Sequence, residues 1–115
     1  MNDNILFIKS KKFALRIMKL SNYLRKKKEF LIQNQIFRSG TSIGANVAES
    51  IYAASKADFV NKLQIALKET SETEYWLDLL SESGILTESE SKSIIADCKE
   101  IARILTTTIK TSKTS

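Results

Sequence analysis

The sequence has no proline and only three glycines in 115 residues, so little interrupts a helical spacing of its apolar residues. Apolar side chains recur at three- and four-residue steps through four long segments, which indicates amphipathic helices that face a common core. The predicted helices cover residues 4–28, 31–54, 56–83 and 88–110, and the tail 111–115 is expected to fray. Four helices with short connections predict a single all-α domain over residues 1–115, an antiparallel up-down four-helix bundle.

Local signals mark where two of these helices begin. Ser55 followed by Asp58 is typical of a helix start, because the hydroxyl accepts a hydrogen bond from a free backbone N–H and the acid lies at the positive end of the helix. Thr87 with Glu90 forms the T-x-x-E pattern of a capping box. Gly84, just before it, favours the end of the third helix.

Three small residues follow one another at four-residue steps in the second helix: Gly40, Gly44 and Ala48. Each glycine costs about 1 kcal/mol relative to alanine inside a helix. Aligned small side chains allow a neighbouring helix to approach closely. The pattern therefore predicts a close helix contact along this line.

Two polar stretches continue the helical period where a bundle is expected to be apolar: RSGTSIGANVAES, residues 38–50, and KETSETEYWLDLL, residues 68–80. A polar group held against a core costs a few kcal/mol unless it is paired. Arg38 could reach Glu69 or Glu72 on the next helix, with Asn46 or Ser42 satisfying the remaining lone pairs. We predict a structural polar network, with direct ligand contact as the alternative, made of Arg38, Ser42, Asn46, Glu49, Glu69 and Glu72.

The chain contains no histidine, which argues against the chemistry most often built into helical bundles. A di-metal centre would use Glu-x-x-His pairs, and nucleophilic catalysis would lack its usual general base. Glu69 and Glu72 have a suitable spacing but would need several more converging oxygens to hold a hard cation. We expect no metal site, no cofactor and no enzymatic activity.

The cellular environment is expected to be the cytoplasm. The longest wholly apolar run, residues 5–8, is far shorter than the ~20 residues of a membrane span, and no signal-peptide pattern opens the chain. Cys98 is the only cysteine, so an intrachain disulfide is impossible. Its apolar neighbours favour a small buried side chain over a reactive thiol.

Positive charge is concentrated at one end of the chain. Residues 1–30 carry nine basic and two acidic side chains, a net charge of 9 − 2 = +7, whereas the remaining 85 residues carry nine basic and eleven acidic ones, a net charge of −2. Such an asymmetry indicates a polyanionic partner, although a solvated helix face is the alternative. The candidate nucleic-acid-binding residues of the first helix, with a tyrosine that could stack on a base, are Lys9, Lys12, Arg16, Lys19, Tyr23, Lys26 and Lys27.

Taken together, the two polar stretches resemble the four helix bundle family that includes proteins encoded in 23S rRNA intervening sequences. The resemblance covers essentially the whole chain. It implies a short up-down bundle, and relatives include the accessory subunit of diversity-generating retroelements, which assembles as a pentameric ring and binds nucleic acid and a reverse transcriptase. The family's motif falls on Arg38, Ser42, Ile43, Asn46, Glu49, Glu69, Glu72 and Trp76.

The sequence and the resemblance together lead to one functional expectation and one alternative. We expect a non-enzymatic homo-oligomer, a pentamer by resemblance, that binds RNA or DNA through the basic surface of the first helix. The alternative is an adaptor that recruits a partner enzyme such as a reverse transcriptase, with the same surface as its docking site.

Overall fold

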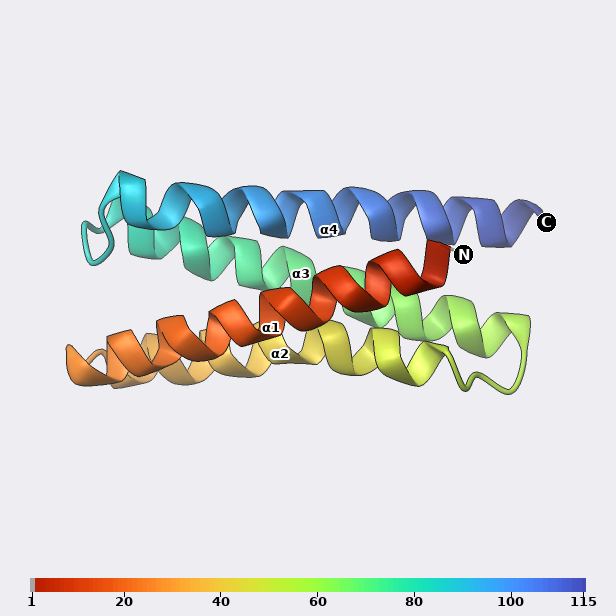
Figure 1. Cartoon of the computed structure of the whole chain (residues 1–115), viewed down its shortest axis with the longest axis horizontal. Coiled ribbons are helices and arrows are strands. Elements are labelled where there is room, and N and C mark those ends of the chain that lie inside the picture. Colours follow the sequence, from red (N-terminus) through yellow and green to blue (C-terminus); the bar gives the residue numbers. More distant parts are fainter. Residues whose placement is uncertain (1) are drawn as a thin grey trace.

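The computed structural model describes the backbone of residues 2–115 and the side chains from Ile5 onward. The described residues form four helices and no strand: α1 (Asn2–Lys26), α2 (Phe30–Ser50), α3 (Lys56–Glu82) and α4 (Glu88–Thr114). They build a rod of 46 × 20 × 19 Å, in which α1 and α3 run one way and α2 and α4 run the other (Figure 1). The predicted all-α four-helix bundle is confirmed.

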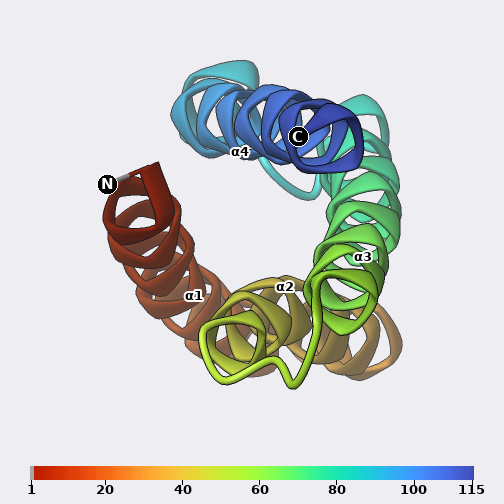
Figure 2. The same cartoon turned by 90° about the vertical axis from the view of Figure 1, so that its right-hand side faces the viewer.

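Helices that follow one another in the sequence are neighbours in the bundle. Viewed from one end, α1, α2, α3 and α4 lie in that order around the axis (Figure 2). The pairs α1–α2, α2–α3 and α3–α4 pack extensively, whereas α1 and α4 make the fewest contacts of the four neighbouring pairs. The bundle is therefore closed most loosely between its first and last helices.

The core follows a coiled-coil spacing. In α2 and α3 most buried residues recur at alternating steps of three and four, as in helices that pack knobs into holes. These residues are Gln33, Ile36, Ser39, Gly40, Ile43, Val47 and Ser50 in α2, and Val60, Leu63, Ala66, Thr70, Thr73, Leu77 and Leu80 in α3. Buried residues of α1 and α4, among them Phe13, Ile17, Ile101 and Leu105, pack against them in the same core.

The end of α1 differs slightly from the prediction, which carried the helix to Lys28. Lys28 has a φ of 63°, in the left-handed region. The N–H of Glu29 then donates to the carbonyl of Leu24 at 2.9 Å, and that of Lys28 donates to Arg25 at 2.9 Å. This is a Schellman arrangement, which satisfies the last carbonyls of the helix and turns the chain into α2.

Two other boundaries also shift. α2 ends at Ser50, not at residue 54, because the N–H groups of the next residues bond three residues back: Ile51 to Ala48, and Tyr52 to Glu49. Ile51 and Tyr52, the two residues that follow α2, are exposed. In contrast, α4 continues to Thr114, where the sequence predicted a frayed tail from residue 111.

The predicted helix starts are confirmed. The hydroxyl of Ser55 accepts from the N–H of Asp58 at 3.1 Å, and Thr87 and Glu90 form the reciprocal capping box. The N–H of Thr87 donates to the Glu90 carboxylate and lowers the pKa of Glu90 from its ordinary 4.5. This interaction stabilises the fold above pH 4.5 and is lost as the pH falls through the lowered pKa.

The line of small residues in α2 faces α1. A β-carbon added to Gly40 would lie 2.7 Å from Cγ1 of Ile17, and one added to Gly44 would lie 3.3 Å from the backbone oxygen of Ser10. Both glycines therefore lie at a close contact between the two helices, as their spacing predicted.

Candidate nucleic-acid interface

The basic residues of α1 divide into two lines, of which the inner one faces α4. Lys9 pairs with Glu100 at 3.3 Å. Arg16 pairs with Asp97 at 2.6 Å and also donates to the hydroxyl of Ser93 at 3.1 Å. Both ion pairs bridge the loosely packed boundary between α1 and α4.

The inner line continues toward the end of α1. The hydroxyl of Tyr23 donates to Glu90 at 3.2 Å, and the ammonium of Lys27 donates to the carbonyl of Ile85 at 3.0 Å. Lys27 also lies 4.8 Å from the centre of the Tyr23 ring. Hydrogen bonding to Tyr23 is the main reason why the pKa of Lys27 is raised.

The seven candidate nucleic-acid-binding residues therefore do not share one environment. Lys9, Arg16 and Tyr23 contact α4, and Lys27 contacts the segment just before it. Glu100 and Asp97 of α4 pair with Lys9 and Arg16 and offset part of their positive charge. These four residues are already engaged within the monomer and are less suited to meet phosphates.

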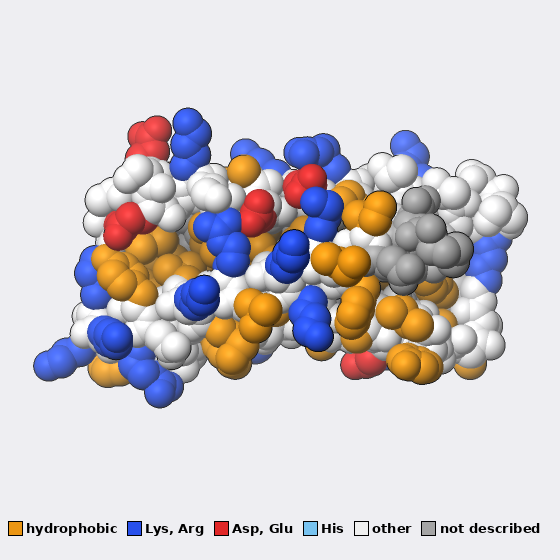
Figure 3. Space-filling model, viewed as in Figure 1, with side chains coloured by type: hydrophobic (Ala, Val, Ile, Leu, Met, Phe, Trp, Pro, Cys, Tyr) orange, Lys and Arg blue, Asp and Glu red, His pale blue; other side chains and the backbone are white. Residues whose placement is uncertain are grey.

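The outer line consists of Lys12, Lys19 and Lys26, which are exposed and form no ion pair within residues 5–115. Their spacing of seven residues places them on one side of α1, about 10 Å apart along the helix. Figure 3 shows lysine and arginine side chains gathered over α1 and at the end of the bundle where α1 meets α2. Three further exposed cations lie outside the predicted set: Lys11 and Arg25 of α1, and Lys28 just after it.

Apolar side chains lie among the outer cations. Ile8, Leu15 and Met18 are 51%, 54% and 46% exposed on α1. Because the apolar stripe of a helix normally faces the core, their position on the outer side makes this face suitable for contact with another macromolecule.

The second predicted site centres on Arg38, which joins α2 to α3. Its guanidinium pairs with Glu69 at 3.2 Å and with Glu72. The indole N–H of Trp76 donates to Glu72 at 2.9 Å, and Arg38 also donates to Gln35. The predicted pairing across the two helices is present, with Trp76 and Gln35 as the supporting partners.

The other members of the predicted network lie apart from this cluster. The amide of Asn46 donates to the backbone carbonyl of Ser42, one turn earlier in its own helix. Glu49 accepts from Lys62 at 2.8 Å, and this hydrogen bond raises the pKa of Lys62. The predicted network is thus divided between the Arg38 cluster and the separate Glu49–Lys62 pair, and Asn46 and Ser42 do not complete the Arg38 site.

The buried polar residues of the two stretches lie outside the predicted network: Ser39, Ser50, Thr70 and Thr73. The hydroxyl of Thr73 lies 2.9 Å from that of Ser39 and 2.8 Å from the carbonyl of Glu69. Both residues lie at the three- and four-residue steps of the core, which is the signal that could have identified them.

Replacement of Arg38 by alanine is expected to lower the free energy of unfolding by about 1 kcal/mol, as measured by urea denaturation. The effect is smaller than the ~3–5 kcal/mol of a buried pair, because the Arg38 side chain is 50% exposed. Arg103→Ala is the matched control, since Arg103 is exposed and unpaired within the described residues. Equal stability of the two variants would contradict a structural role for Arg38.

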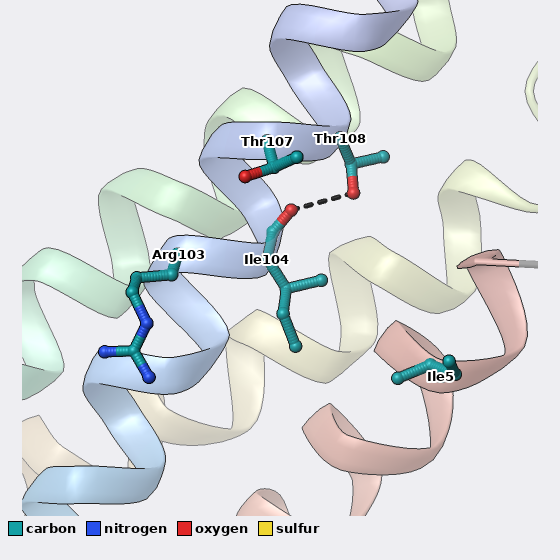
Figure 4. Close-up of a pocket in the computed structure, with 5 residues that line it drawn as sticks. All are labelled: Ile5, Arg103, Ile104, Thr107 and Thr108. Atoms are coloured by element: carbon teal, nitrogen blue, oxygen red, sulfur yellow. Dashed lines mark hydrogen bonds between the residues drawn. The ribbon is translucent and has the colours of Figure 1, made fainter.

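The described residues contain no group of three or more histidine, cysteine or acidic side chains placed to hold a metal ion. Figure 4 shows a hollow between the start of α1 and α4, with Ile5 on one side and Arg103, Ile104, Thr107 and Thr108 on the other. The hydroxyl of Thr108 is bonded to the carbonyl of Ile104 at 2.7 Å. The lining is mostly apolar and brings together no acid–base pair.

Among the described residues, no helix combines the length and the apolar character needed to cross a membrane.

Comparison with known proteins shows which family the chain is similar to. The model of the family described as 23S rRNA-intervening sequence protein matches residues 2–107. A solved structure of a protein with unknown function from the S23 ribosomal protein family of Bacteroides thetaiotaomicron is 50% identical, with a TM-score of 0.93. The match covers 96% of this chain and 99% of that one. A search of curated proteins gave no match.

Proposed function

Because the chain belongs to the family of 23S rRNA-intervening sequence proteins, we propose that it is a non-enzymatic homo-oligomer that binds RNA or DNA through α1. The observation that carries this proposal is the outer line of α1, Lys12, Lys19 and Lys26, whose exposed ammonium groups form no ion pair with a described carboxylate. Phosphates attract such exposed cations irrespective of nucleotide sequence. With nucleic acid as the ligand, we further propose that the protein acts in the cytoplasm.

Oligomerisation would multiply a modest affinity. Three cations per copy make few phosphate contacts, but a symmetric assembly presents the same line several times to one strand. The exposed apolar residues Ile8, Leu15 and Met18 are compatible with contacts between copies. Native mass spectrometry tests this part of the proposal, with five copies as the number that the family resemblance implies.

Removal of the three outer lysines tests the binding surface. The combined change Lys12→Gln, Lys19→Gln and Lys26→Gln is expected to weaken binding to single-stranded nucleic acid by about 100-fold at 0.1 M salt. The slope of log K against log salt should become less steep by about 2, since each phosphate contact contributes roughly −0.7. Fluorescence anisotropy over a series of salt concentrations measures both quantities.

The matched control removes three exposed lysines of α4, Lys92, Lys99 and Lys110, and so changes the net charge equally. It should leave the slope close to that of the original protein. Equal effects of both triple variants would show that net charge alone matters. An absence of salt-sensitive binding by the original protein would contradict nucleic-acid binding altogether.

A second candidate function, recruitment of a partner enzyme, is favoured by the exposed apolar side chains of the outer face of α1. Pull-down of a purified reverse transcriptase discriminates between the two. If Leu15→Ser abolishes capture while nucleic-acid binding is unchanged, the adaptor function is supported. Arg16, whose ion pair with Asp97 supports the fold, is unsuitable for this test.

A further inference from the structure

One buried hydroxyl group has no partner. Ser21 of α1 is 3% exposed, and its Oγ is the one buried side-chain nitrogen or oxygen without a hydrogen bond among the described residues. Other buried hydroxyls, such as those of Ser50 and Thr70, donate to carbonyls of their own helices. Because buried polar groups are nearly always paired, Ser21 marks a place where a water molecule or a ligand completes the structure.

Ser21 lines a hollow of about 360 Å³ between the last turns of α1 and the first turns of α2. We call this the α1–α2 pocket. Its lining contains one hydroxyl, three amides, one guanidinium and one aromatic ring, and no carboxylate: Ser21, Asn22, Arg25, Gln33, Asn34 and Phe37.

The polar groups of the pocket are available to a ligand. Gln33 is only 6% exposed, yet its amide makes no hydrogen bond within the described residues. Arg25 is exposed and unpaired there, in contrast to Arg16 and Arg38, which pair with carboxylates. The buried hydroxyl of Ser21 and the accessible amide of Gln33 line the same hollow and form a set of directional donors and acceptors.

This combination matches the chemistry of a nucleotide. Glutamine and asparagine amides can pair with the donor and acceptor edge of a base, and an aromatic ring can stack on its face. Phe37 is 40% exposed, so part of its ring is accessible for stacking on a base. A guanidinium binds phosphate through two parallel hydrogen bonds, which Arg25 can supply. The exposed Lys26 and Lys28 add positive charge nearby in the chain.

We propose that the α1–α2 pocket holds one unpaired nucleotide of a bound single strand. Phe37 stacks on the base, Ser21, Gln33 and Asn34 bond to its edge, and Arg25 pairs with the adjoining phosphate. The inference rests on the proposed binding of nucleic acid. It adds a preference for exposed bases that the outer line of lysines cannot supply, because phosphate contacts carry no information about bases.

The test compares a normal single-stranded oligonucleotide with an abasic strand of the same length and charge, in fluorescence anisotropy. The protein is expected to bind the normal strand at least about tenfold more tightly, the range of one stacked base. Phe37→Ala and Asn34→Ala, both at exposed positions, should each remove most of this preference and leave the salt slope unchanged. Phe30→Ala, an exposed aromatic residue of the same helix outside the pocket, is the matched control.

Ser21→Ala separates a ligand from a water molecule. If the hydroxyl bonds to a base, this variant loses part of the base preference at unchanged or higher thermal stability. If the preference is intact in Ser21→Ala, Asn34→Ala and Phe37→Ala alike, the pocket holds only water and the inference is overturned.

The two proposals fail in different ways. Equal binding of normal and abasic strands, with a normal salt slope, would overturn the nucleotide pocket and support the binding surface on α1. If neither strand binds, the proposed function fails, and the pocket inference fails with it.

Discussion

Replacement of Gly40 by valine is expected to lower the free energy of unfolding by about 3 kcal/mol, the upper part of the range for overpacked cores. Even a β-carbon at this position would lie 2.7, 2.9 and 3.0 Å from three carbons of Ile17. Ile17 is 0% exposed and β-branched, so it cannot turn away from the added atoms. The gain of about 1 kcal/mol in helix propensity on replacing glycine does not offset this collision.

Urea denaturation followed by circular dichroism measures the change. Ala45→Val is the matched control, because Ala45 lies on the same helix and is exposed. A double-mutant cycle with Gly40→Ala and Ile17→Ala tests whether Ile17 is the cause. The double variant should lose less free energy of unfolding than the sum of the two single losses, because the shortened side chain at position 17 leaves space for the added β-carbon at position 40. Additive effects would mean that α1 does not constrain position 40.

The thiol of Cys98 is expected to react with alkylating reagents at pH 8 about a thousandfold more slowly in the folded protein than in the unfolded chain. Burial, with smaller contributions from the nearby carboxylates of Glu74 and Asp78, raises the pKa of Cys98 from 9.0 to about 12. The side chain is 0% exposed, and its sulfur donates to the carbonyl of Thr70 at 3.5 Å. The prediction of a small buried side chain at this position is thus confirmed.

Labelling with iodoacetamide, followed by mass spectrometry with and without guanidinium, measures the two rates. An Ala45→Cys change in a Cys98→Ala background provides an exposed thiol that should react at similar rates in both conditions. If Cys98 in the folded protein reacts within about tenfold of the unfolded rate, the core opens far more often than this packing implies. Gly40→Val, by destabilising the bundle, should accelerate the labelling of Cys98.

Much of the fold follows from local sequence. The third and fourth helices begin at Ser55 and Thr87 because a capping hydroxyl acts within three residues of its partner. The close approach of α1 at Gly40 could also be predicted from the sequence, because four-residue steps align small side chains on one side of a helix. The exact ends of α1 and α2 were harder to predict, because the left-handed Lys28 and the turn at Ile51 involve no strong breaker residue.

The candidate sites were only partly predictable. The pairing of Arg38 with Glu69 and Glu72 could be predicted, because the two polar stretches lie in consecutive helices, which pack side by side. Ser39 and Thr73 were missed because small hydroxyl side chains look equally suited to a surface or to a core. The α1–α2 pocket combines residues from two helices, and no spacing within either helix reveals it.

The sequence by itself determined an all-α bundle, its helix starts, its family and the excess of positive charge on α1, since all of these depend on residue type and short-range spacing. Only the tertiary structure decided which of those charges are available to a ligand. Lys9 and Arg16 pair with carboxylates 91 and 81 residues away, across the boundary with α4, whereas Lys12, Lys19 and Lys26 form no ion pair among the described residues. The attraction between two charges depends on their distance in space and is screened over about 10 Å at 0.1 M salt, so ion pairing depends on how the helices are packed and not on their order in the chain.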